Sequence, residues 1–176
     1  MPDELIRVRD RQAADVSQCI DALATVHEGS GYPTNWPADP ARWLTPSGML
    51  RGWIAVTDDL PVAGQVIVRA VPATAAGRPA AEVSRLFVVP AARRRGVAGA
   101  LLQQAMHWAA AAGLDLVLEV TDHLRPARAL YERAGFRLAS TYLADWTTPD
   151  GQPVTLHHYI WSAEPVAESW PAGAAG

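Results

Sequence analysis

The feature that most constrains this chain is a strand, a glycine-containing turn, a long helix and a second strand, in that order. Residues 81–89 end in an apolar run that Pro90 stops, and the helix expected over 97–112 ends at Gly113. A mostly apolar strand follows at 114–120. A helix that joins two strands in this way makes them parallel or nearly so, and buried on both faces. The segment therefore predicts an α/β architecture.

The remaining segments predict further strands and helices around this unit. Alternating apolar and polar residues indicate a short strand at 5–9, and apolar residues at three- and four-residue spacing indicate a helix at 15–27. Further strands are expected at 52–57, 60–71, 136–146 and 154–161, and further helices at 39–44 and 125–134. The last two strands should form an antiparallel hairpin. We expect one domain over residues 1–163 and a flexible tail over 164–176.

Composition excludes several classes of protein. The chain has 176 residues, 49% of them hydrophobic, which is enough for a single packed core. A net charge of −3 provides no general attraction for nucleic acid or an anionic membrane. The one cysteine, Cys19, excludes a disulfide within the chain and a cysteine-based zinc site. With no signal-peptide pattern and no long apolar run, we expect a cytoplasmic protein without a metal, nucleic-acid or membrane partner.

The turn before the long helix has the chemistry of an anion-binding site. The first N–H groups of a helix are unpaired and carry partial positive charge. Gly96, Ala98 and Gly99 would let a phosphate oxygen approach the backbone, and Arg93–Arg95 add positive charge. A pyrophosphate fits this arrangement. The alternatives are a tight turn beside solvated arginines, or a nucleic-acid patch, which the lack of interleaved aromatic residues disfavours.

Two sequence motifs, one at the start of the long helix and one in the next helix, resemble motifs of one protein family. Arg93-x-x-Gly96-x-Ala98 resembles the Arg/Gln-x-x-Gly-x-Gly/Ala signature of the Gcn5-related N-acetyltransferase (GNAT) superfamily, and residues 127–136 are similar to its Ala-x-x-Leu-Tyr-x-x-x-Gly-Phe segment. The resemblance is strongest over 81–137 and extends over 5–162. It implies a mixed seven-stranded sheet whose central parallel strands splay apart, flanked by about four helices, with acetyl-CoA in the cleft between those strands.

The resemblance also implies which residues bind acetyl-CoA. The backbone amides of residues 94–99 would hold the pyrophosphate, and the edge of the strand at 86–88 would pair with the pantetheine arm. The main-chain N–H near Val88 would face the thioester oxygen, where a fixed donor stabilises the oxyanion formed by amine attack. The implied acetyl-CoA contacts are Leu86, Phe87, Val88, Arg93, Arg94, Arg95, Gly96, Val97, Ala98 and Gly99.

Catalytic roles follow from the same resemblance. Tyr131 matches a tyrosine that often acts as general acid toward the departing thiolate, although the same spacing fits a core aromatic. Glu82 stands at the offset of a catalytic glutamate in the histone-modifying branch, and Glu119, His123 or a chain of water molecules are alternative bases. Leu124 departs from the family pattern, because many members have an asparagine there that contacts the pantetheine arm or the loop.

The amine acceptor would bind among aromatic residues of the first two helices and the last hairpin. Tyr32, Trp36 and Trp146 are the candidate acceptor-binding residues, with Trp43 and Trp53 in the same region. Carboxylates stand nearby in the sequence at Glu28, Asp39 and Asp145. Aromatic rings beside carboxylates suit an amine with an apolar body, although tryptophans also fill the cores of small domains.

The sequence therefore predicts an acetyl-CoA-dependent N-acetyltransferase that acts on a primary amine of a small molecule or a peptide. We expect direct attack in a ternary complex, because Cys19 lies in the first helix, far from the cleft. The alternative is an acyl-CoA-binding sensor or interaction protein without catalytic activity, which the departure at Leu124 motivates. A homodimer is expected through the exposed last hairpin.

Overall fold

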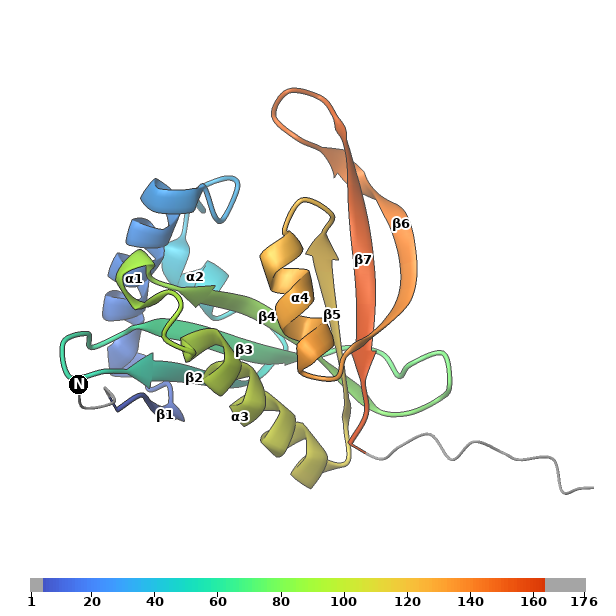
Figure 1. Ribbon diagram of the computed structural model, residues 1–176, viewed down its shortest axis with the longest axis horizontal. Coiled ribbons are helices and arrows are strands. Elements are labelled where there is room, and N and C mark those ends of the chain that lie inside the picture. Colours follow the sequence, from blue (N-terminus) through green and yellow to red (C-terminus); the bar gives the residue numbers. More distant parts are fainter. Residues whose placement is uncertain (1–4, 164–176) are drawn as a thin grey trace, which may run out of the picture.

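A computed structural model describes residues 5–163 and shows one mixed sheet of seven strands in the order β1-β2-β3-β4-β5-β7-β6 (Figure 1). The strands are β1 (Arg7–Asp10), β2 (Met49–Val56), β3 (Gly64–Ala70), β4 (Ala80–Val88), β5 (Asp115–Thr121), β6 (Arg137–Thr147) and β7 (Pro153–Trp161). The α-helices are α1 (Val16–Ser30), α2 (Pro40–Leu44), α3 (Val97–Ala112) and α4 (Arg125–Arg133). This architecture confirms the predicted fold class. The flexible tail expected at 164–176 lies outside the described residues.

Two glycines set the length of α3. Gly96 precedes the helix with φ of 83°, Gly113 follows it with φ of 69°, and both angles lie in the left-handed region that favours glycine. Between them, apolar side chains at helical spacing pack the helix against β2, β3 and β4. The buried side chains of α3 are Val97, Leu101, Leu102, Ala105 and Ala109. The helix bounds agree with the sequence prediction.

The two central parallel strands separate soon after they begin. β4 and β5 pair only through Ala80–Glu82 and Asp115–Val117, and β5 then runs beside β7, to which it is antiparallel. β7 also pairs with β6 in the predicted closing hairpin. Figure 1 shows β4 turning away from β5 toward α1 and α2. The splayed sheet predicted from the family resemblance is confirmed, and the gap between its halves positions the site described below.

The hairpin between β2 and β3 differs from the sequence prediction. β3 begins at Gly64 instead of Leu60, and the connection is closed by the Thr57 N–H donating to Leu60 O at 3.1 Å and by Ala63 N–H donating to Ala55 O at 2.8 Å. Pro61 explains the delay, because proline has no N–H to give to a strand ladder. No helix in the described part of the chain is long and apolar enough to cross a membrane.

Candidate active site

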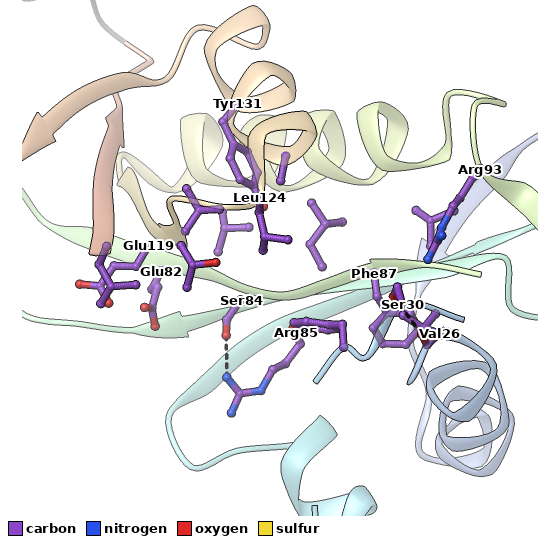
Figure 2. Close-up of a pocket in the computed structure, with 18 of the residues that line it drawn as sticks. Val26, Ser30, Glu82, Ser84, Arg85, Phe87, Arg93, Glu119, Leu124 and Tyr131 are labelled. Carbon is purple, nitrogen blue, oxygen red and sulfur yellow. Dashed lines mark hydrogen bonds between the residues drawn. The ribbon is translucent and has the colours of Figure 1, made fainter. Parts of the chain in front are cut away.

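The separation of β4 and β5 leaves a cleft of about 520 Å³. Figure 2 shows it running along β4, with Glu82 and Glu119 at one end and Arg93 at the other. α3 and α4 lie on one side of β4 and α2 on the other (Figure 2). The cleft is lined by residues from α1, β4, β5, α4 and the β6–β7 hairpin, among them Ser30, Tyr32, Leu86, Phe87, Val88, Leu124, Ala127, Tyr131 and Trp146.

Open backbone amides lie at the start of α3. The first hydrogen bond of the helix runs from the Ala100 N–H to Gly96 O at 3.0 Å. The N–H groups of Val97, Ala98 and Gly99 therefore precede the helical ladder, and the described residues provide no acceptor for them. A Cβ built on Gly96 or Gly99 would meet no atom within 4 Å, so open space lies in front of this backbone. The residues present fit a bound pyrophosphate.

The three arginines before this helix point to different places. Arg93 lines the cleft, and Arg94 is exposed with φ of 60°. Arg95 instead lies toward the β2–β3 connection, where its Nη2 is 3.5 Å from Asp59 Oδ1 and its Nη1 donates to Ala91 O at 3.4 Å. Arg95 therefore pairs with Asp59, a residue distant in the sequence, and of the three arginines only Arg93 lines the cleft.

Tyr131 forms part of the α4 side of the cleft. Its ring packs against Phe136 and Tyr159, with centroid distances of 5.9 and 6.5 Å. Burial raises the pKa of the Tyr131 hydroxyl well above its usual value, and Tyr32 adds a smaller effect in the same direction. Among the described residues nothing hydrogen-bonds this hydroxyl. Tyr131 thus keeps its proton at neutral pH and has it available for a group in the cleft.

Tyr159, which the sequence did not single out, holds α4 in place. It is fully buried on β7, and its hydroxyl donates to Glu132 Oε1 at 2.7 Å and accepts from Arg128 Nε at 3.3 Å. Both partners lie on α4, on either side of Tyr131. No local pattern marks Tyr159, because its role depends on the pairing of β5 with β7.

The two glutamates at the end of the cleft have different partners. Arg69 Nε donates a hydrogen bond to Glu82 Oε2, which fixes this half-buried carboxylate. Glu119 accepts a hydrogen bond from the Tyr142 hydroxyl, and this bond raises the pKa of Tyr142 to about 12. His123, the third candidate base, is exposed and is not among the lining residues. The structure therefore brings two of the three candidates into the cleft.

The candidate acceptor-binding aromatics divide into two groups. Tyr32 and Trp146 line the cleft, and Trp43 packs edge-on against Tyr32 with a centroid distance of 6.0 Å. Trp36 is instead 40% exposed, packs against His27 and does not line the cleft. Trp53 is buried on β2 against Trp108 of α3.

The nearby carboxylates are also placed by the structure. Asp39 caps α2 by accepting a hydrogen bond from the Arg42 N–H at 3.0 Å. Glu28 and Asp145 do not line the cleft. None of these three carboxylates lines the cleft, whereas the candidate bases Glu82 and Glu119 do.

The fold and the cleft define the class of protein as an acetyltransferase. The model of the acetyltransferase (GNAT) family matches residues 19–136, which is more than half of the chain, and the chain belongs to this family. A comparison with curated proteins found no match.

Solved acetyltransferase structures share the fold. NAA60 of Arabidopsis thaliana in complex with acetyl-CoA is 18% identical, with a TM-score of 0.71 and coverage of 90% of this chain and 99% of that one. The ribosomal-protein-S18-alanine N-acetyltransferase of Escherichia coli is 19% identical, with a TM-score of 0.72 and coverage of 94% and 99%. A GCN5-related N-acetyltransferase of Kribbella flavida is 28% identical, with a TM-score of 0.67 and coverage of 89% and 97%.

Proposed function

We propose that the protein transfers the acetyl group of acetyl-CoA to a primary amine of a small molecule or peptide, by direct attack in a ternary complex. The observation that carries this proposal is the cleft itself. Arg93 lines one end of the cleft, the wall contains Tyr131, and the far end contains Glu82 and Glu119. The open helix amides of residues 97–99 do not line the cleft themselves but follow Arg93 closely in the chain. The cleft thus joins an arginine next to the proposed phosphate site to a proton donor and two carboxylates.

The proposed placement of acetyl-CoA follows the length of the cleft. The backbone of residues 94–99 binds the pyrophosphate with help from Arg93, and residues 86–88 of β4 run beside the pantetheine arm. The acetyl group then lies near Tyr131 and the glutamates. Leu124 lines this path with an apolar side chain, so any contact with the arm at this position is made through van der Waals packing.

The proposed proton transfers use residues that the cleft brings together. Tyr131 donates its proton to the thiolate that leaves when the amine attacks the thioester carbon. Glu82, held by Arg69, takes a proton from the attacking ammonium group directly or through water, and Glu119 is the alternative base. Cys19 is not a plausible acyl carrier, because the thiol is fully buried and burial raises its pKa to about 11.

Release of CoA thiol in the presence of a panel of primary amines tests the proposal. Tyr131→Phe should lower kcat about 100-fold or more while CoA affinity, measured by calorimetry, stays the same. Glu82→Gln should lower the rate most near neutral pH, where the amine is mainly protonated, and less at alkaline pH. An unaltered pH–rate profile would remove Glu82 as the base.

A non-catalytic acyl-CoA-binding protein is the second candidate, favoured by Leu124 at the position of the common asparagine. Tight CoA binding without thiol release from any amine, and without an effect of Tyr131→Phe, would support it. We further propose a homodimer through the edge strand β6, which ends the sheet and exposes apolar side chains. The cytoplasmic location and the lack of metal, nucleic-acid and membrane partners stay predictions.

A further inference from the structure

Arg85 occupies an irregular position in β4 that redirects its side chain. The register between β3 and β4 shifts between the pairs Ile67–Ser84 and Gln65–Phe87, and Arg85 has φ of 53° within this bulge. An arginine with a left-handed backbone conformation is strained, and this conformation persists only where the surrounding structure holds it. Figure 2 shows the result: the guanidinium lies beside Ser84, on the side of β4 facing α2 and away from Tyr131.

The surroundings of the Arg85 guanidinium are aromatic and contain no matching anion. Its Cζ lies 4.5 Å from the centre of the Trp43 ring, Nε donates to Trp43 O at 3.3 Å, and Nη1 donates to Ser84 Oγ at 2.9 Å. Among the described residues, no carboxylate lies within ion-pair distance of Arg85, and its Nη2 has no acceptor. Nη2 is not sealed in the interior, and Arg85 lines the cleft.

Arg85 lies close to Glu82, the proposed base. Glu82 and Ser84 alternate onto the same face of β4, and the bulge adds Arg85 to that face (Figure 2). Glu82 is ion-paired with Arg69, and no ion pair joins it to Arg85. The acceptor side of the cleft thus contains a carboxylate suited to an amine and, one side chain further along, a guanidinium suited to an anion.

We propose that the acceptor is a small amino acid, whose amine is placed at Glu82 and whose carboxylate is bound by the free Nη2 edge of Arg85. The inference rests on the proposed acetyl transfer and names its substrate class. A peptide N-terminus does not meet the same requirement, because the carboxyl group of its first residue is an amide and would leave Arg85 without an anion. The Tyr32 ring, which packs against Trp43, provides an apolar wall beside the acceptor side chain.

The experiment compares free amino acids with their own amides. The probes are L-amino acids and β-alanine, each paired with its carboxamide, and kcat/KM is measured by thiol release from acetyl-CoA. The amino group of a carboxamide is less basic than that of the free amino acid. The ratio of kcat/KM for the acid to kcat/KM for its carboxamide is therefore compared between enzyme variants at one pH. We expect Arg85→Gln to reduce this ratio about 10- to 100-fold, mainly through the KM of the free acids.

Two further variants separate charge from folding. Arg85→Lys keeps a cation at the same backbone position and should retain part of the preference for free acids over amides. The preference should be weaker than in the wild type, because lysine lacks the planar guanidinium fork. Arg42→Gln removes an exposed arginine from the neighbouring helix α2 and should leave the ratio unchanged. Thermal melting of each variant shows whether it is folded.

The outcomes distinguish this inference from the proposed function. Thiol release with no preference for free acids, or with a preference that Arg85→Gln leaves intact, would overturn the inference and keep the acetyltransferase. If no probe is acetylated, binding of the same pairs to the CoA-bound protein is measured by NMR. Arg85-dependent binding of the acids would then support the carboxylate site while the proposed function fails, and equal binding of acids and amides would overturn both.

Discussion

Asp15 shows how one ion pair shapes the entry to α1. Its two carboxylate oxygens accept hydrogen bonds from Arg9 Nη1 and Nη2, each at 2.8 Å, and Oδ2 also accepts from the Gln12 N–H at 2.7 Å. The hydrogen bonds from Arg9 are the main reason that the pKa of Asp15 falls to about 2, and the Gln12 N–H acts in the same direction. Asp15 thus joins β1 to α1, because it accepts from the Gln12 N–H ahead of the helix and pairs with Arg9 of β1.

This ion pair predicts a pH-dependent stability. A carboxyl group whose pKa is lower in the folded state stabilises the fold above its unfolded pKa of about 4, and the contribution is lost as the pH falls toward 2. Asp15→Asn should lower the free energy of unfolding by about 1–2 kcal/mol at pH 7, after allowance for the half-exposed Arg9. Urea unfolding at pH 7, 5 and 3 measures the difference in unfolding free energy between wild type and variant. This difference should become smaller as the pH falls. Asp21→Asn, at an exposed position of α1, is the matched control; a pH-independent loss for Asp15→Asn would contradict the assignment.

At the scale of elements, both ends of α3 carry a glycine with positive φ, but the two ends present different backbone groups. Gly96 and Gly113 both have positive φ, and a Cβ on either one would meet no atom within 4 Å. Only the Gly96 end presents unpaired N–H groups next to the cleft, whereas the Gly113 N–H donates to Ala110 O at the end of the helix. The positive end of the helix dipole therefore points toward the proposed phosphate site.

This difference can be tested by the same substitution at both ends. Gly96→Glu places a carboxylate in front of the amides and should abolish detectable CoA binding in calorimetry. Gly113→Glu imposes the same left-handed strain at the other end of the helix and should leave CoA affinity unchanged. Both variants should lose about 1 kcal/mol of stability, because the strain is common to them. Unchanged CoA affinity in Gly96→Glu would refute the phosphate site.

At the scale of the whole molecule, the sheet consists of two parts joined by a short parallel ladder. β1 to β4 form one part, β5, β7 and β6 form the other, and three residue pairs connect β4 to β5. The second part ends in β6, whose outer edge is unpaired and whose apolar side chains are largely exposed. The exposed apolar residues of β6 are Leu138, Tyr142, Leu143 and Trp146.

The proposed homodimer predicts a change in mass when this edge is altered. Leu143 is 67% exposed, and Leu143→Glu should shift the protein from dimer to monomer in sedimentation experiments. Leu5 is 62% exposed outside the sheet, so Leu5→Glu adds the same charge at a comparable but distant position and should leave the dimer intact. A wild-type protein that stays monomeric across micromolar concentrations would contradict the dimer.

Sequence patterns predicted the features that depend on neighbouring residues. The bounds of α3 and the open amides beside Gly96 are local, because each depends on residues within one turn of helix. The splayed sheet followed from the family resemblance, since the motifs around Arg93 and Tyr131 identify the fold as a whole. The predicted start of β3 at Leu60 is wrong, because Pro61 has no N–H for the strand ladder and β3 begins at Gly64.

Tertiary structure decided which of the candidate side chains share one cleft. Arg95 is drawn to Asp59, Trp53 packs into the core and Trp36 against His27, whereas Tyr32 and Trp146 reach the site from opposite ends of the chain. The sequence by itself determined the elements and the amides at the helix start, since local backbone preferences fix both. Only the folded chain determined that Arg85 lies near Glu82 without an ion-pair partner of its own among the described residues, because a bulge and contacts with the distant helix α2 turn its side chain there.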